Sequence, residues 1–315
     1  MTSAAMRWRY ATADVFTDRM FGGNPLAVVL DAVGLSTAQM QAIALEFNYS
    51  ESTFVLPPED PAHTARIRIF TPRTEVPFAG HPNVGTAFVL ARESRFAAAA
   101  AAGAFVFEEA AGLVPMKLLH ERGCAVGAEL RAPEPLSRRS ILSREAAAAC
   151  LSLDERDIAM QAHPPQIVSV GLPFVVAELR SREALRRSKP NIAVHSQLLP
   201  LDGADAIFAY WRAGDETSSG QTVLHARMYS PLDGIVEDPA TGSACGAAIA
   251  LLASLDLPAT SEENGRAERA WRIHQGEDMG RPSLLLGRTM AHGASLTETH
   301  VGGRCVPMFE GTLAV

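Results

Sequence analysis

The chain carries the same five-residue pattern twice. Arg68–Pro72 and Arg227–Pro231 each read arginine, aliphatic or thioether residue, aromatic residue, hydroxyl residue, proline. About half of the 315 residues separate the two copies. A repeat this long indicates a duplicated domain, because solenoid repeats have periods of roughly 20–50 residues. The chain length also allows about two domains.

A glycine turn and a helix start follow each copy. Ala79–Pro82 reads Ala-Gly-His-Pro, and Thr241–Ala244 reads Thr-Gly-Ser-Ala. Both segments that follow are rich in small residues, which would let a helix pack inside a sheet. The expected domains are residues 1–131 and 136–304, with a C-terminal strand near 305–315 packing back onto the first.

The two helix starts are candidate ligand sites. The first turn of a helix exposes about four free N–H groups and carries a partial positive charge. Two such starts facing each other across a cleft would bind a carboxylate. The alternative is that both are packed strand-to-helix turns without a ligand, and the repeat alone leaves this open.

Local patterns predict several further elements. Ser36 begins a helix as its N-cap, and Asn48 ends it, since asparagine tolerates the left-handed conformation. The small-residue helices are expected from about Asn83 to Arg92 and from Ser243 to Ala253. The polar stretch 260–265 is expected to be an exposed loop.

Composition narrows the classes of function. The formal net charge of −7 argues against nucleic acid or an anionic membrane as the main partner. No apolar run is long enough for a membrane span, and the first ten residues lack the apolar core of a signal peptide. We therefore expect a cytoplasmic protein. Its four widely spaced cysteines are expected to be free thiols: Cys124, Cys150, Cys245 and Cys305. No pattern in the sequence predicts a metal site.

Two residues near the first glycine turn are candidates for proton transfer. Glu51 lies at the mouth of an apolar strand, where partial loss of water suits a general acid/base. The alternative is a solvated loop glutamate. His81 at the helix start could donate to a substrate oxygen or relay a proton. It could equally be a turn histidine bonded to nearby backbone.

The second glycine turn offers a different set. Asp238 could bind an amine or hydroxyl of a substrate, or it could simply cap the helix. The hydroxyls of Thr241 and Ser243 could donate to a carboxylate. Cys245 could be an activated thiol, although a small buried hydrophobic residue is the simpler interpretation.

At these residues the sequence resembles the phenazine-biosynthesis PhzF-like family. The resemblance extends from residue 14 to residue 283, nearly the whole chain. The most specific segments are the Gly-His-Pro turn and the Glu-Asp-Pro-Ala-Thr-Gly-Ser-Ala string. The matching segments are Asp14–Thr17, Gly23–Pro25, Ser50–Val55, Phe78–Pro82, Glu237–Ala244, Gln275–Gly276 and Gly280–Ser283.

The resemblance implies the diaminopimelate-epimerase-like fold. This is an α/β (α+β) fold of two pseudo-symmetric domains, each a mixed sheet around a central helix, with the active site between them. It also implies a cofactor-independent isomerase, often a homodimer, that acts on a small carboxylate. In the type member the substrate is trans-2,3-dihydro-3-hydroxyanthranilate, and the glutamate matching Glu51 moves a proton on it. The matching pocket residues are Gly80, His81, Asp238, Gly242 and Ser243.

Other activities occur on the same fold. Its cysteine-pair racemases and epimerases carry a thiol just before the glycine of each turn. Here those positions are Ala79 and Thr241, so a two-thiol mechanism is not expected. The leading hypothesis is a cofactor-independent isomerase with Glu51 as general acid/base. The alternatives are a non-catalytic binding protein for small carboxylates and an amino-acid racemase or epimerase of this fold.

Overall fold

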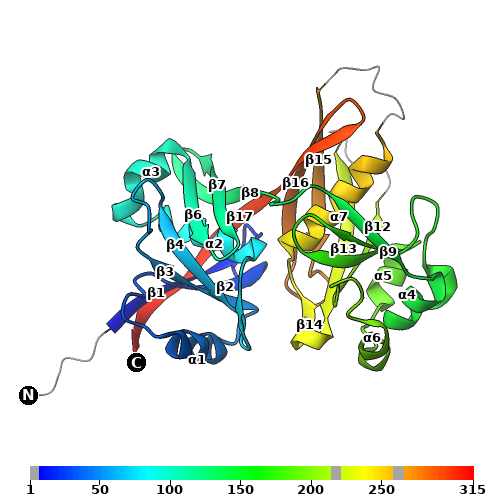
Figure 1. The fold of residues 1–315 in the computed structure, drawn as a ribbon, viewed down its shortest axis with the longest axis horizontal. Coiled ribbons are helices and arrows are strands. Elements are labelled where there is room, and N and C mark those ends of the chain that lie inside the picture. Colours follow the sequence, from blue (N-terminus) through cyan, green and yellow to red (C-terminus); the bar gives the residue numbers. More distant parts are fainter. Residues whose placement is uncertain (1–6, 214–220, 258–265) are drawn as a thin grey trace, which may run out of the picture. The chain divides into compact units, whose positions relative to one another are not determined.

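The computed structural model describes residues 7–213, 221–257 and 266–315 of the chain, which Figure 1 draws as a ribbon. It divides into two compact units. Unit 1 comprises Met1–Leu130 and Gly302–Val315, and unit 2 comprises Arg131–Val301. The predicted loop at 260–265 lies outside the described residues.

Unit 1 is a closed sheet around one helix. Its strands pair in the order β17–β1–β2–β3–β4–β6–β7–β8, and β8 returns to β17. The helix inside is α2 (Gly80–Leu90), every residue of which is buried. The strands are β1 (Arg7–Val15), β2 (Asn24–Val29), β3 (Glu51–Leu56), β4 (Ala65–Phe70), β5 (Glu75–Val76), β6 (Ala104–Glu109), β7 (Gly112–Glu121), β8 (Cys124–Arg131) and the C-terminal part of β17 (Ser295–Ala314).

The smaller helices of unit 1 lie outside this sheet. They are α1 (Thr37–Phe47), the 3₁₀ helix η1 (Ser94–Phe96) and α3 (Ala97–Ala102). The side chain of Ser36 caps α1, and Asn48 ends it in the left-handed conformation at φ 53°. Both predictions for this helix are confirmed.

Unit 2 is built on the same plan. Its strands pair in the order β9–β10–β11–β12–β13–β15–β16–β17, with β14 added to β13. The central helix α7 (Gly242–Leu255) packs against β10, β11, β12, β15 and β16. The strands are β9 (Ser137–Ile141), β10 (Gln166–Ser169), β11 (Pro173–Glu178), β12 (Ile207–Arg212), β13 (Thr222–Ser230), β14 (Ile235–Asp238), β15 (Arg266–Gln275), β16 (Ser283–His292) and the first part of β17.

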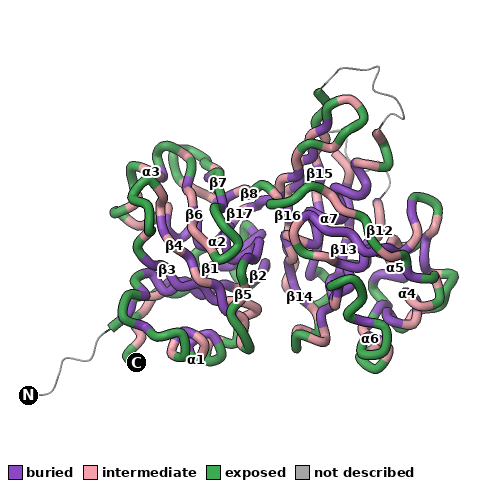
Figure 2. Tube along the Cα trace, in the orientation of Figure 1, coloured by how far each residue is buried: buried purple, intermediate pink, exposed green. Residues whose placement is uncertain are grey.

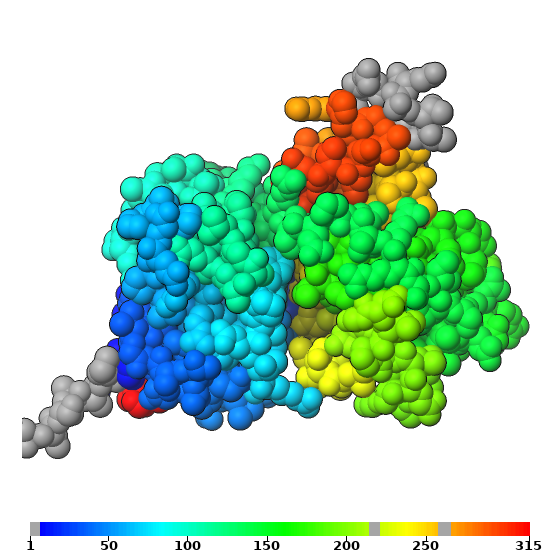
Figure 3. Space-filling model, viewed as in Figure 1, coloured from blue at the N-terminus to red at the C-terminus, as the bar shows by residue number. Residues whose placement is uncertain are grey.

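Short helices lie on the outside of unit 2. They are α4 (Arg144–Cys150), η2 (Glu155–Asp157), α5 (Arg182–Arg187), α6 (Ile192–Leu198) and η3 (Pro231–Asp233). The segments that hold α4 and α6 form part of the visible surface in Figure 3. In Figure 2 α6 is mainly exposed or intermediate, whereas α7 is mainly buried.

Strand directions repeat between the units. The pairs β2–β3 and β4–β6 are parallel in unit 1, and β11–β12 and β13–β15 are parallel in unit 2. The intervening pairs, β3–β4 and β12–β13, are both antiparallel. The two copies of the sequence pattern lie on β4 and β13, immediately before the strand and helix that follow in each unit. The duplication inferred from the pattern is therefore present in the fold.

The repeated arginine makes the same contacts in both units. Arg68 donates two hydrogen bonds to Glu75 on β5, at 2.7 and 2.6 Å. Arg227 donates two to Glu237 on β14, at 2.8 and 2.7 Å. Each guanidinium also covers the aromatic ring two residues further on, at 5.1 and 5.2 Å from the ring centroid. The five-residue pattern thus encodes a strand-to-strand clamp over an aromatic side chain.

The bounds of the central helices differ from the prediction. The first begins at Gly80 and ends at Leu90, not at 83 and 92. Pro82 lies inside the first turn, where its missing N–H removes no helical hydrogen bond, so the helix extends back to the glycine. The second runs from Gly242 to Leu255 and is longer than the predicted 243–253. Both helices are almost wholly buried, as their small side chains led us to expect.

Candidate active site

Glu51 and His81 lie together in unit 1. Glu51 is the first residue of β3, opposite Leu26 on the parallel strand β2. His81 is the second residue of α2. The Oε2 atom of Glu51 is 3.3 Å from Nδ1 of His81, and the two side chains are only 18% and 4% exposed. Glu51 is therefore a partly desolvated carboxyl group beside an imidazole and not a solvated loop residue.

His81 is a neutral imidazole at physiological pH. Burial lowers its pKa to about 3, and a hydrogen bond to the carbonyl of Pro25 offsets this only in part. The contact with Glu51 is consequently not an ion pair. The Nδ2 atom of Asn24 lies 3.4 Å from Nδ1 of His81, while Nε2 has no protein partner among the described residues. A buried polar atom without a protein partner is left to bind a water molecule or a ligand.

The start of α2 carries no side-chain cap. Its N-cap, Ala79, is in an extended conformation and makes no capping hydrogen bond. The outer helices α1, α4, α5 and α6 each begin at a serine or asparagine whose side chain accepts from the first turn. The first-turn N–H groups around Gly80 are thus not satisfied by a cap, and they add partial positive charge beside Glu51.

Asp238 and Thr241 lie together in unit 2. Asp238 is the last residue of β14 and is 4% exposed. Thr241 is the N-cap of α7, yet its side chain makes no capping bond. Its hydroxyl is instead 2.6 Å from Oδ2 of Asp238. The N-cap residue of α7 is therefore Thr241, and its side chain makes no capping hydrogen bond, just as Ala79 makes none at the start of α2.

Two further candidates occupy the first turn of α7. Gly242 is buried, and Ser243 is partly exposed. Their backbone N–H groups belong to the four that an uncapped helix leaves without a helical partner. The polar groups available at this turn are therefore backbone donors and hydroxyls, next to one carboxylate.

Cys245 is a buried thiol. It is fully buried, and burial together with the charge of Asp238 raises its pKa well above the usual range. Its Sγ atom is 3.6 Å from Oε1 of Gln275, to which it donates. All four cysteines are free, as predicted. Among the described residues, no group of three or more histidine, cysteine, aspartate or glutamate side chains could hold a metal ion.

Sequence reasoning missed two residues of these clusters. Asn24 contacts the imidazole of His81, and its segment Gly23–Pro25 was noted only as part of the resemblance. Gln275 contacts both Asp238 and Thr241 and was likewise noted only there. Each is separated by more than thirty residues from its partners, so local spacing contains no signal for either contact.

Nearly the whole chain matches a known family. Residues 13–311 match the PhzC-PhzF model, described as phenazine biosynthesis-like protein. An uncharacterized isomerase of Mesorhizobium japonicum is 39% identical, over 97% of this chain and 98% of that protein. The trans-2,3-dihydro-3-hydroxyanthranilate isomerase of Pseudomonas fluorescens is 34% identical, over 97% of this chain and 99% of that protein.

A solved structure supports the same assignment at the level of fold. The PhzF-family phenazine biosynthesis protein of Bacillus anthracis superposes with a TM-score of 0.82. The alignment covers 98% of this chain and all of that one, at 23% sequence identity.

Two mixed sheets, each wrapped around a buried helix with polar groups at its start, define a diaminopimelate-epimerase-like isomerase fold. The chain belongs to the PhzC-PhzF family of phenazine biosynthesis-like proteins. The predictions of fold class, of family and of an isomerase are confirmed. In the described part of the chain, no helix is both long and apolar enough to cross a membrane.

Proposed function

We propose that the protein is a cofactor-independent isomerase that moves a proton on a small cyclic carboxylate, with Glu51 as the general acid/base. The observation that carries this proposal is the 3.3 Å contact between Glu51 and a neutral, buried His81. A carboxylate in such a place can accept a proton from carbon and return it to another carbon of the same substrate.

The neutral state of His81 matters for this role. A cationic imidazole beside Glu51 would stabilise the carboxylate and make it a weaker base. A neutral imidazole can orient the carboxylate without this penalty. Its Nε2 atom, which has no protein partner among the described residues, can exchange a hydrogen bond with the substrate.

The polar groups of both units favour a substrate with several functional groups. The uncapped helix starts at Gly80 and Gly242 offer N–H donors for a carboxylate. Asp238 can accept from an amine or hydroxyl, and Ser243 and Thr241 are nearby hydroxyls. We propose that both half-sites act on one substrate in a cleft between the two domains of a cytoplasmic homodimer.

The name of one relative supports a particular substrate class for the test. The substrate named for the Pseudomonas fluorescens relative, trans-2,3-dihydro-3-hydroxyanthranilate, is a ring that bears a carboxylate, an amine and a hydroxyl. These are the groups that the two half-sites can bind. This compound or a close analogue is therefore the first substrate to test.

The test is proton NMR of trans-2,3-dihydro-3-hydroxyanthranilate in D₂O with wild type and Glu51→Gln. We expect wild type to convert the compound, with deuterium entering at carbon. The variant should lose about 10²–10⁴-fold in kcat, the usual range for removing a general acid/base. The matched control is Glu46→Gln, an exposed glutamate of α1, which should retain full turnover. Full turnover by Glu51→Gln would refute the assignment of the base.

The two alternatives give other results in the same experiment. A binding protein would return the compound unchanged, without deuterium, although it would still bind it. A thiol-dependent epimerase would lose activity in Cys245→Ala. The raised pKa of this buried thiol argues against that mechanism, so we expect this variant to remain active.

A further inference from the structure

Gln275 lies at the centre of the polar cluster beside α7. It is the last residue of β15 and is fully buried. The turn that follows holds it in place. Gly276 has φ +74°, and a Cβ atom there would lie 2.3 Å from the carbonyl oxygen of Arg281, so only glycine fits.

The amide of Gln275 makes four contacts. Its Nε2 atom donates to the backbone carbonyl of Asp238 at 2.9 Å and to the hydroxyl of Thr241 at 3.0 Å. Its Oε1 atom accepts from the backbone N–H of Thr241 at 3.2 Å and from the thiol of Cys245 at 3.6 Å. A backbone N–H can only donate and a backbone carbonyl can only accept, so these contacts fix which end of the amide is which.

This orientation decides where the proton of Thr241 points. The hydroxyl oxygen accepts from the Gln275 amide, and an amide NH₂ cannot accept in return. The single hydroxyl proton is therefore available to Oδ2 of Asp238, which lies 2.6 Å away. A short hydrogen bond to a carboxylate is among the stronger ones in proteins and restrains the rotation of the acceptor. Gln275 also holds the Asp238 backbone through its carbonyl.

We propose that Gln275 is a positioning residue that aims the Thr241 hydroxyl at Asp238 and thereby holds this carboxylate in its working orientation. The proposal deepens the function proposed above and rests on it, because Asp238 is taken to hold the substrate. It assigns the Thr241 hydroxyl to Asp238 and leaves Ser243 and the helix N–H groups to the substrate.

The first test is a double-mutant cycle between Gln275→Leu and Thr241→Val. The kcat and KM for trans-2,3-dihydro-3-hydroxyanthranilate are measured for both single variants and for the double variant. Each single variant should lower kcat by about 10–100-fold, the size expected for misplacing a working group by about 1 Å, while KM changes by less than about 3-fold. The double variant should be no worse than the worse single one, because both substitutions break one chain of hydrogen bonds.

Two further variants separate positioning from a general effect on folding. Thr241→Ser keeps the hydroxyl and should restore kcat to within about 3-fold of wild type. Cys245→Ala removes the fourth contact of the amide but none of the contacts to Asp238 or Thr241. It should leave kcat within about 2-fold, since it breaks only a weak thiol hydrogen bond. If the two losses multiply in the double variant, or if Thr241→Ser is as impaired as Thr241→Val, the proposal is wrong.

A crystal structure of Gln275→Leu tests the inference without any assay. We expect the oxygen of Thr241 and Oδ2 of Asp238 to move beyond about 3.5 Å, outside hydrogen-bond range. If they stay in contact, Gln275 does not aim this hydroxyl, whatever the substrate is. If wild type fails to convert the compound, the proposed function fails while this structural result still decides the inference. Should Gln275→Leu not fold, Gln275→Met takes its place in the crystals, because its unbranched side chain has a similar length and no N–H to donate to Thr241.

Discussion

The ends of β6 and β15 occupy equivalent positions in the two units, but the buried polar side chains at these ends differ in their hydrogen bonding. Each strand runs parallel to the strand with the repeated arginine, and each ends beside the central helix. At the end of β15, both amide atoms of Gln275 have partners. At the end of β6, the carboxyl group of Glu109 has the side-chain amide of Asn83 beside it, but among the described residues neither group forms a hydrogen bond of normal geometry.

This difference shows what burial does to an acid whose hydrogen bonds are incomplete. Loss of water raises the pKa of Glu109 from its ordinary value of 4.5 to about 8, and the nearby Asn83 amide offsets only part of the shift. An amide in the same place has no charge to lose and can be satisfied by one donor and one acceptor. At the start of α7, Gln275 belongs to a connected series of hydrogen bonds with Thr241 and Asp238. Near the start of α2, the corresponding polar groups are two carboxyl side chains, Glu51 on β3 and Glu109 on β6.

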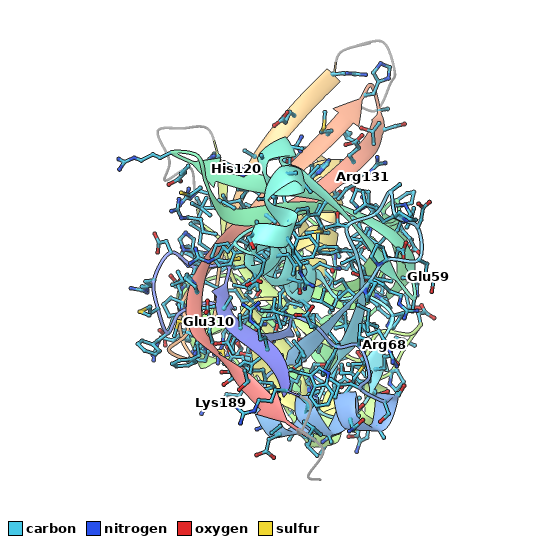
Figure 4. The ribbon with its side chains drawn as sticks, turned by 90° about the vertical axis from the view of Figure 1, so that its left-hand side faces the viewer. Glu59, Arg68, His120, Arg131, Lys189 and Glu310 are labelled. Carbon is cyan, nitrogen blue, oxygen red and sulfur yellow. The ribbon has the colours of Figure 1, made fainter. Side chains whose placement is uncertain are left out.

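The two repeated arginines also differ between the units, in how far their side chains are buried. The side chain of Arg227 is 11% exposed and also donates to three backbone carbonyls near the end of α5. The side chain of Arg68 is 25% exposed and donates instead to the hydroxyl of Thr37. In Figure 4 Arg68 lies at the periphery of unit 1, on the same side as Glu59. One pattern thus makes a buried clamp in unit 2 and a more exposed one in unit 1.

The two candidate acids, Glu51 in unit 1 and Asp238 in unit 2, do not lie at equivalent positions of the repeat. Arg68 pairs with Phe54, and Arg227 pairs with Ala209. Three residues before these partners lie Glu51 in unit 1 and Ala206 in unit 2. The two halves of the duplication therefore carry different polar groups on the same backbone plan.

The largest expected effect is the loss of the buried clamp. Arg227→Met leaves Glu237 half-buried without its partner and removes the donor for three carbonyls. We expect the free energy of unfolding to fall by about 3–5 kcal/mol, the usual cost of breaking a buried ion pair. Urea unfolding followed by circular dichroism measures it. Arg68→Met is the matched control and should cost about 1 kcal/mol or less. Equal losses in the two variants would contradict the contrast.

The next effect depends on pH. Because the folded protein holds a proton on Glu109 up to about pH 8 and the unfolded chain releases it near pH 4.5, folding becomes less favourable as the pH rises between these values. Glu109→Gln has no proton to lose, so it should be more stable than wild type at pH 8 by about 4 kcal/mol and similar at pH 4. Urea midpoints from pH 4 to pH 9 measure this difference.

The neighbouring Glu108 serves as a control of opposite sign. Hydrogen bonds from the backbone of Glu59 and Asp60 and from His63 lower its pKa to about 2. Its charged form is favoured by folding, so any stability it adds is present above pH 4.5 and lost as the pH falls toward 2. Glu108→Gln should therefore not gain stability at high pH. If Glu109→Gln and Glu108→Gln gain the same stability at pH 8, burial of Glu109 is not the cause of the gain.

The smallest expected effects come from the glycines inside the central helices. A Cβ atom on Gly85 would lie 2.5 Å from a methyl of Leu26 and 2.6 Å from one of Val15. Gly85→Ala should therefore destabilise unit 1 by about 1–3 kcal/mol, because a close-packed core must shift to admit it. A Cβ atom on Gly246 would meet its nearest neighbours at 3.4 Å. Gly246→Ala should be neutral or stabilising by up to about 1 kcal/mol, since alanine favours helix. Thermal unfolding of both variants ranks them, and a Gly246→Ala variant less stable than Gly85→Ala would overturn this order.

Much of the fold could be predicted because the signals for it are local. The capping serine and the left-handed Asn48 mark both ends of α1 and lie only twelve positions apart. The small residues after Gly80 and Gly242 indicate helices that can be buried on every side. The long strand β15 was not predicted, because its charged and polar side chains, such as Arg269 and Arg272, hide the apolar alternation.

The sequence by itself determined the duplication, the two glycine turns and the residue types that gather at them. Only the tertiary structure decided what those residues do to one another. His81 is neutral because the packed sheet around α2 removes water from it, and its partner Glu51 comes from a strand thirty residues away. The proton of Thr241 points at Asp238 because Gln275, at the end of another strand, donates to the same oxygen. Desolvation and hydrogen-bond direction depend on contacts between distant segments, and no local pattern records them.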